Sequence, residues 1–502
     1  MILSRYNEFI IFKQLNDNDN SVLFFKIWRN IVLKKKIWND AILISKYDHQ
    51  KINYLKDLRE HKHREYIRSI SFEDKFNEKL ENGDIPDTCS KLKFSNDFKT
   101  ILDPKVLPNS IMYLCLGSSY NHIIEKDVLP KNLKEINFGG SFNKVIEVNT
   151  IPNKVNRIEF STFYVSSFNN VIKIGAFPNS LTYLDLGGRY NIKLNKGILP
   201  DSLRTLLLSS IYNFPIKKGD LPKNLTSLTF GEQFDQYVKD GDGDDNDEDN
   251  GCNILPKSLK VLKFGLSQTR PISISKLNNL EELIFSDYFN EEIKGFPKSL
   301  KKIQFPFKYN KPLLPNSIDN VTEIIFGNEF DSPIELNTFK SIKSLTFGTH
   351  FNKEIKPFVL NQGIERLTFG YYFNKSFQQN SLPSSLTFLQ LGREFNQKIE
   401  PGTFPNNIKH LVYSNRDKSP LTIGILPLSL ETLEFLFFNA PIEPFSIPNG
   451  CKKITLSTQF QNHPITNNVI PQSCKTLVIS TLYKSELLDL KSLPSGIDLS
   501  FI

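Results

Sequence analysis

Apolar and polar residues follow one another in a short phrase that recurs along most of the chain, at intervals of about 22 residues. A clear copy is LPKNLTSLTFGEQFD at 221–235. Leu228 and Phe230 are two residues apart and therefore point to one face of a strand, while Ser227 and Thr229 point to the other. The phrase predicts a short strand with one buried and one exposed face.

Such self-similarity along a chain is typical of a solenoid rather than of several globular domains. A five-residue strand cannot bury its apolar side alone, but parallel strands stacked coil upon coil bury one another. We therefore expect a mainly β solenoid of about 20 coils of 22 residues with one parallel sheet.

The residues around each strand have their own physical roles. Gly follows the strand in many copies, as at Gly139 and Gly370, where the chain must bend and a left-handed backbone is expected. An aromatic-Asn pair comes next, as at 142–143. We expect the Asn side chains to bond backbone groups of the adjacent coil, and the aromatic side chains to fill the core rather than to stack on bases.

The succession of Phe-Asn, Ile and then Ile/Leu-Pro resembles the FNIP repeat, a variant of the leucine-rich repeat abundant in social amoebae. The resemblance covers about residues 67–502. It implies a leucine-rich-repeat-like arc with a parallel sheet along one side, and it implies no chemistry.

The amino-terminal part of the chain lacks the repeat. Residues 1–20 are expected to form a flexible tail. Apolar residues at steps of three to four predict two short amphipathic helices within 21–46, and a third helix is expected at 49–66. The domain plan is therefore a small helical module at 21–66 followed by the solenoid at 67–502.

A helical module ahead of leucine-rich repeats resembles the layout of F-box adaptor proteins, and many members of the FNIP-repeat family carry an F-box-like head. This resemblance implies that the head docks on the adaptor subunit of a cullin-RING ubiquitin ligase while the repeats present a substrate. The usual L-P-x-E opening is missing here. The residues expected to dock are Leu23, Phe24, Ile27 and Trp28.

The alternative is a plain scaffold or ligand-binding repeat protein whose helical head only caps the solenoid. The two interpretations differ in where the apolar surface between Leu23 and Trp38 lies. A docking head leaves it exposed, whereas a cap buries it against the coils of Phe72 and Phe94.

The net charge of the chain is +8, and twelve Lys/Arg against five Asp/Glu place +7 of it within residues 21–70. This basic patch, with Lys34, Lys35 and Lys36, could attract an acidic partner, a membrane surface or nucleic acid. A solvated helix face is favoured, and nucleic acid is not expected, because the repeats carry no basic stripe that would extend the footprint.

One interval between repeats is longer because of the run VKDGDGDDNDEDNG at 238–251. Alternating Asp residues suggest a calcium loop, but Asp245 stands where an EF-hand needs Gly, and Gly251 stands where it needs Glu. A solvated acidic loop is favoured, with weak calcium binding as the lesser alternative.

Motifs of catalysis, metal binding and membrane insertion are absent from the sequence. No hydrolase, P-loop or zinc-protease pattern occurs, and the five cysteines are scattered without C-x-x-C pairs. Cys115 is expected to be an ordinary surface residue. No apolar run is long enough for a membrane span and no secretory signal opens the sequence, so we expect a non-enzymatic, intracellular, cytoplasmic protein without cofactor or metal.

A partner protein is expected on the exposed face of the sheet, where the residues vary while the core repeats. Exposed Tyr, Phe and Arg often carry binding energy. The alternative is that neighbouring strands simply pair these side chains with one another. The two predicted clusters are Tyr113, Arg157 and Tyr183, and Arg366, Phe388 and His410.

Overall fold

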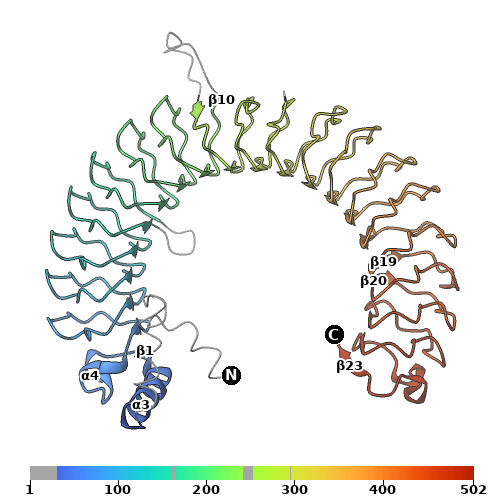
Figure 1. Ribbon diagram of the computed structural model, residues 1–502, viewed down its shortest axis with the longest axis horizontal. Helices are drawn as coiled ribbons and strands as arrows, with labels where there is room; N and C mark the ends of the chain where they lie inside the picture. Colours follow the sequence, from blue (N-terminus) through green and yellow to red (C-terminus); the bar gives the residue numbers. More distant parts are fainter. Residues whose placement is uncertain (1–30, 161–165, 241–252, 294) are drawn as a thin grey trace. The chain divides into compact units, whose positions relative to one another are not determined.

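The computed structural model describes residues 31–160, 166–240, 253–293 and 295–502. The chain divides into two compact units, Met1–Leu181 and Thr182–Ile502. Each unit is a stack of coils whose strands lie side by side along one side of the stack (Figure 1). The predicted mainly β solenoid with a parallel sheet is confirmed.

The first unit begins with helices and continues as a parallel sheet. Its helices are α3 (Ile31–Tyr47), α4 (Leu55–Arg59) and the short 3-10 helix η3 (Arg64–Tyr66). Its strands are β1 (His49–Ile52), β2 (Ser69–Phe72), β3 (Lys91–Lys93), β4 (Tyr113–Cys115), β5 (Glu135–Asn137) and β6 (Arg157–Glu159). Each strand pairs in parallel with the next along the chain.

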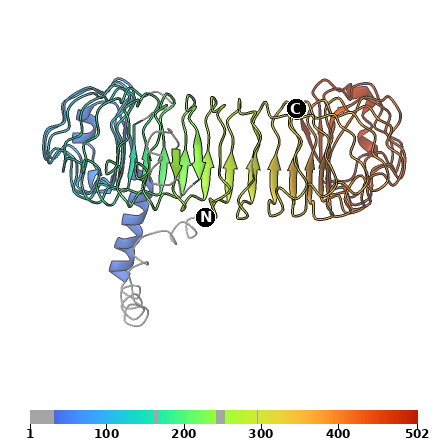
Figure 2. The same ribbon diagram turned by 90° about the horizontal axis from the view of Figure 1, so that it is seen from above.

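The second unit repeats the same pairing over more coils, and Figure 2 shows its strands as adjacent arrows of one direction. The strands of its first half are β7 (Tyr183–Asp185), β8 (Thr205–Leu207), β9 (Ser227–Thr229), β12 (Val261–Lys263), β13 (Glu282–Ile284), β14 (Lys302–Gln304) and β15 (Glu323–Ile325). The remainder are β16 (Ser344–Thr346), β17 (Arg366–Thr368), β18 (Phe388–Gln390), β19 (His410–Asn415), β20 (Thr432–Phe438), β21 (Lys453–Thr455), β22 (Thr476–Ile479) and β23 (Asp498–Phe501). Two short 3-10 helices, η4 (Ser485–Leu487) and η5 (Leu490–Ser492), lie between the last two strands.

The core is built from the central residue of each strand and from stacked aromatic rings. Leu345 and Leu367, at the centres of β16 and β17, are buried and opposite one another. The Phe347 ring stacks on Phe369 of the next coil, with centroids 5.5 Å apart, and on Phe351 of its own coil at 3.8 Å. The aromatic side chains of this stack are therefore core residues, as the sequence predicts.

The Asn residues that follow the aromatics connect adjacent coils. The backbone N–H of Asn374 donates to Oδ1 of Asn352 at 2.9 Å, and the N–H of Asn396 donates to Oδ1 of Asn374 at 2.8 Å. In the first unit the N–H of Asn143 donates to Oδ1 of Asn121 at 2.9 Å. These bonds satisfy backbone donors that the strand ladder cannot reach, which confirms the predicted structural role.

The glycines after the strands are required by close approach of the backbones. Gly139 has a positive φ of 79°, as expected, but Gly370 is not in the left-handed region, so that expectation is wrong for Gly370. At both positions an added Cβ would overlap the carbonyl oxygen of the glycine one coil earlier, Gly117 or Gly348. Lack of space, rather than backbone conformation, is the constraint that they share.

The head differs from the sequence prediction. The expected helix at 49–66 is wrong, because β1 occupies His49–Ile52 and only the five residues of α4 are α-helical. β1 pairs in parallel with β2, and this ladder satisfies backbone groups that a lone helical turn would not. Within 21–46 the structure describes residues 31 onward, where a single helix of 17 residues, α3, runs to Tyr47.

The first three residues of the acidic insertion form a β-strand. Val238, the first residue of the predicted insertion, is buried and bridges to Ile272. β10 (Val238–Asp240) pairs in parallel with β11 (Asn253–Leu255). The run between these strands, to which the solvated-loop prediction and the calcium alternative apply, lies at 241–252, outside the described residues.

Candidate functional site

The exposed face of the second unit's sheet carries the second predicted cluster. Parallel, in-register pairing aligns the first residues of successive strands in one row, so that Arg366 is opposite Phe388 and Phe388 is opposite His410. The third residues form a second row, in which Thr368 is opposite Gln390. Side chains 22 residues apart in sequence are thus direct neighbours on the surface.

The cluster is held by stacking interactions. The guanidinium carbon of Arg366 lies 4.0 Å from the centroid of the Phe388 ring, and the His410 ring meets Phe388 edge-on at 4.9 Å. Nε2 of His410 lies 3.3 Å from Oε1 of Glu434, although the angles do not make a hydrogen bond. The structure therefore brings Arg366, Phe388 and His410 together, as the sequence analysis proposed.

A second group of aromatic and arginine side chains lies just beyond the strand ends. The guanidinium of Arg393 lies 4.1 Å from the centroid of Phe437 and 5.5 Å from that of Tyr371. Arg416 approaches the same Phe437 ring at 5.1 Å and pairs with Glu394 at 2.7 Å. Cation–π contacts of this kind hold the guanidinium plane against a ring and leave its edge available.

Sequence reasoning missed this second group, and a signal for it was present. Gly or Ser directly follows the strand in most coils, but Leu436 occupies that position after Phe435. The strands there continue to six residues in β19 and seven in β20, instead of the three or four of the other strands. The longer strand carries Leu436, which is 38% exposed, and Phe437 onto the surface.

A shallow groove runs along the carboxyl ends of β15 to β18 and reaches the second group. Its floor includes Thr346, Thr368 and Gln390, the third residues of neighbouring strands, together with the backbone of the glycines that follow. Tyr371, Arg393 and Leu436 also line it. The groove thus combines hydroxyl and amide groups with an apolar side chain and a cation.

The first predicted cluster has a different character. Nε of Arg157 donates to Oε1 of Glu159 at 2.8 Å, and the Asn137 amide donates to the other carboxylate oxygen at 2.9 Å. Burial raises the pKa of the half-buried Tyr113 to about 12. Tyr183 opens β7 in the second unit, so only Tyr113 and Arg157 are described within one unit.

Three residues that point to the exposed face are nevertheless buried. Val412 is 6% exposed, and Cys115 and Asn137 are buried as well. The expectation that Cys115 is an ordinary surface residue is therefore wrong. It lies on the same face as the larger Tyr113, and burial raises the pKa of its thiol.

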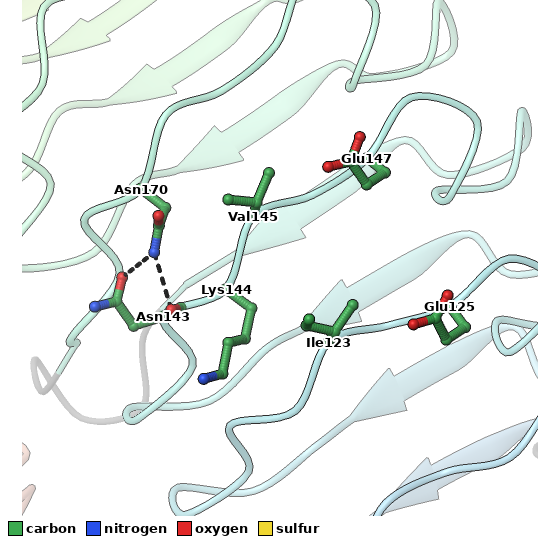
Figure 3. Close-up of a pocket in the computed structure, with 7 residues that line it drawn as sticks. All are labelled: Ile123, Glu125, Asn143, Lys144, Val145, Glu147 and Asn170. Atoms are coloured by element: carbon green, nitrogen blue, oxygen red, sulfur yellow. Dashed lines mark hydrogen bonds between the residues drawn. The ribbon is translucent and has the colours of Figure 1, made fainter.

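A hollow on the first unit is lined by residues that follow the aromatic-Asn pairs (Figure 3). Nδ2 of Asn170 donates to the backbone oxygen and to Oδ1 of Asn143, at 2.9 and 2.8 Å. Ile123 and Val145 provide apolar surface, while Lys144 and the carboxylates of Glu125 and Glu147 give the lining mixed charge. The Asn side-chain amides here link adjacent coils. The hollow therefore arises from the same Asn hydrogen bonds that hold the coils together.

The head residues expected to dock, Leu23, Phe24, Ile27 and Trp28, lie outside the described residues. The helix that follows them is described, and Trp38 is 45% and Ile42 51% exposed on it. The hydroxyl of Tyr66 donates to Asp40 at 2.8 Å, and Tyr47 stacks on His63 at 4.6 Å. These contacts fix one side of α3 and leave apolar side chains outside.

Two features that other classes of function require are not found among the described residues. Nowhere within them do three or more His, Cys, Asp or Glu side chains gather closely enough to hold a metal ion. The helices in the described part of the chain are too short or too polar to cross a membrane.

The coils, register and exposed sheet face define a leucine-rich-repeat-type solenoid, a class of interaction scaffold. The FNIP repeat family model matches the chain at residues 76–119, 120–163, 168–210, 212–241, 309–350, 351–394, 395–437 and 438–482. Because these segments make up more than half of the sequence, the chain belongs to the FNIP-repeat family.

Two known proteins illustrate the relationship. An FNIP repeat-containing protein of Dictyostelium discoideum is 35% identical over 74 residues, which are 15% of this chain and 14% of the relative. The chain thus matches a small part of that protein's length. The crystal structure of CroV588, described as a circular leucine-rich-repeat protein, is 28% identical with a TM-score of 0.66, over 87% of this chain and 73% of that chain.

Proposed function

We propose that this chain is a substrate-recruiting adaptor of a cullin-RING ubiquitin ligase. In this proposal α3 binds the adaptor subunit of the ligase, and the exposed sheet face of the second unit binds a substrate protein. The chain performs no chemistry itself and works in the cytoplasm. The observation that carries the proposal is the exposed apolar side of α3.

The geometry of α3 supports a docking role. Residues of an α-helix are separated by about 100°, so Trp38 and Ile42 share a face and Asp40 lies nearly opposite Trp38. Asp40 is the residue that Tyr66 binds. Trp38 and Ile42 therefore face away from the coils, and Figure 2 shows α3 extending beyond the strand edge of its unit. A Trp and an Ile on one exposed face are typical of a protein-binding site.

In this proposal a different segment caps the solenoid. Ile52 of β1 and Leu55 and Leu58 of α4 are buried at the start of the first unit. β1 pairs with β2, so the start of the Phe72 coil is covered by residues 49–66, without the Trp38 face. Because the buried side chains belong to residues 49–66 while the Trp38 face of α3 is exposed, docking by α3 is favoured over the alternative in which the head is only a cap.

The test compares the partners of three full-length chains. Tagged wild type, Trp38→Ala/Ile42→Ala and the control Asn39→Ala would be immunoprecipitated from the native cells and their partners identified by mass spectrometry. Asn39 is exposed on the same helix but is polar. We expect cullin-RING subunits with wild type and the control, and their loss with the double variant.

Substrate proteins bound by the sheet face should remain with all three chains. If no cullin-RING subunit accompanies even the wild type, while other proteins do, the chain is a binding solenoid without the ligase. Thermal melting of the purified variants checks the fold, and all three should melt alike because the two side chains bury nothing in the core.

A further inference from the structure

Charged side chains on the sheet face of the second unit are mostly neutralised by neighbours. Lys263 lies 3.6 Å from Glu282, and Lys302 lies 3.0 Å from Glu323 on the next strand. Such cross-strand pairs carry no net charge that a partner could recognise.

Arg366 and Arg393 break this pattern. Arg366 has Ser344 and Phe388 as its row neighbours. Arg393 contacts the rings of Tyr371 and Phe437. Neither guanidinium forms an ion pair with a carboxylate of the described residues, whereas Arg416 nearby is neutralised by Glu394. Both Arg366 and Arg393 are exposed.

The two arginines are held in place for recognition. A guanidinium stacked on a ring has lost much of its rotational freedom, and its N–H edge can accept a carboxylate or phosphate in a bidentate fashion. Arg366 stacks at the start of the strands and Arg393 beyond their end, so the two cations flank the exposed rows of β17 and β18.

The groove that Arg393 lines, on the carboxyl side of Arg366, selects an extended, partly apolar ligand. Thr368 and Gln390 offer hydroxyl and amide groups on its floor, and Leu436 offers an exposed apolar side chain. A nucleic acid would need a continuous basic track, but Glu434 lies on the same face next to His410. The chemistry favours a polypeptide with few, separated anionic groups.

We propose that this surface binds an extended protein segment that carries two anionic side chains, one on Arg366 and one on Arg393, with an apolar side chain between them beside Leu436. The proposal rests on the proposed function, since it names the class of substrate segment that the sheet face recognises. The anionic groups are carboxylates or phosphates, which share the same guanidinium chemistry.

The test uses the full-length chain and a phage library of short random peptides. We expect enriched peptides to carry two acidic residues on either side of an apolar one. Arg366→Glu/Arg393→Glu should lower the binding affinity for a fluorescent enriched peptide by roughly tenfold or more. At each position a bidentate contact is lost, and the new glutamate repels the anionic group of the peptide. Lys263→Glu/Lys302→Glu is the matched control, with the same change in charge on the same face, and should bind as wild type does.

Further arms identify the anion and the ligand class. Replacement of the peptide's acidic residues by phosphoserine tightens binding if the natural segment is phosphorylated and weakens it if the segment carries carboxylates. The proposal is overturned if enriched peptides lack acidic residues, if no peptide is enriched, if the arginine variant binds equally well, or if a labelled single-stranded RNA binds more tightly with the same dependence on both arginines. Retention of cullin-RING subunits by the Arg366→Glu/Arg393→Glu chain would show that the ligase role stands even where the peptide proposal fails.

Discussion

Oδ1 of Asn352 accepts a hydrogen bond from the backbone N–H of Asn374, which lies one coil later, at 2.9 Å. The Asn352 side chain is one member of a ladder that ties successive coils together outside the strands, where the turn leaves backbone donors unpaired. A buried or half-buried donor without a partner is costly, so each member contributes to the cohesion of its two coils.

Replacement of Asn352 tests this role directly. Asn352→Ala should lower stability by about 1 kcal/mol, because the Asn374 N–H loses its acceptor. Asn352→Asp is the control, since it retains an acceptor oxygen at the same place and should restore most of the loss. Thermal melting followed by circular dichroism measures both. Equal melting of the alanine variant and wild type would mean that water replaces the side chain.

Two glycines allow the destabilisation caused by lack of space to be compared with that caused by an unfavourable backbone conformation. Gly370→Ala should destabilise the second unit by more than about 2 kcal/mol, because the new methyl group overlaps the Gly348 carbonyl and the coils must separate. Gly402 has a positive φ of 82° but open space around it. Gly402→Ala should therefore cost only about 1 kcal/mol. Chemical denaturation of both variants gives the comparison, and the reverse order would contradict the close-approach explanation.

The capping role of α4 predicts a large effect at one buried leucine. Leu58 is fully buried, so Leu58→Ala should destabilise the first unit by about 2–5 kcal/mol. Leu33→Ala, on the exposed part of α3, should have little effect. Hydrogen exchange followed by mass spectrometry should show faster exchange in β1 and β2 for the Leu58 variant. Unchanged exchange there would mean that α4 does not protect the first coils.

The buried Tyr309 side chain should make the stability of the fold depend on pH in the alkaline range. Burial raises its pKa to about 12 from the ordinary value of 10.0. The folded state therefore holds this proton more tightly than the unfolded state. The stabilisation is complete below pH 10 and is lost as the pH rises from about 10 towards 12. Tyr309→Phe does not titrate, so its melting temperature relative to wild type should rise between pH 8 and pH 11.

A Tyr309→Phe difference that does not change with pH would show that the Tyr309 hydroxyl ionises as easily in the folded chain as in the unfolded one.

The core of each coil follows from local spacing. The two-residue spacing of Leu228 and Phe230 places both side chains inward, and repetition places each beside its counterpart in the next coil. The structural role of the Asn residues was predictable for the same reason, since a residue present in coil after coil must satisfy a need of every coil.

The candidate site was predictable only in part. Arg366, Phe388 and His410 meet because their strands are in register, and the repeat length alone indicates that register. Arg393 and Tyr371 follow the ends of β18 and β17, and they meet Phe437 because β20 continues past the usual strand end. Their contacts depend on the path of two longer strands, which no single repeat reveals.

By itself, then, the sequence determined the class of fold, the core residues and the rows of the sheet face, because a period of about 22 residues converts position along the chain into position in space. The tertiary structure decided which residues are buried ahead of the first coil and which side chains on the outer sheet face are nevertheless buried. It also decided which arginines have no carboxylate partner among the described residues. These depend on pairing between distant segments, such as β1 with β2, and on the size and charge of neighbours that the local pattern does not specify.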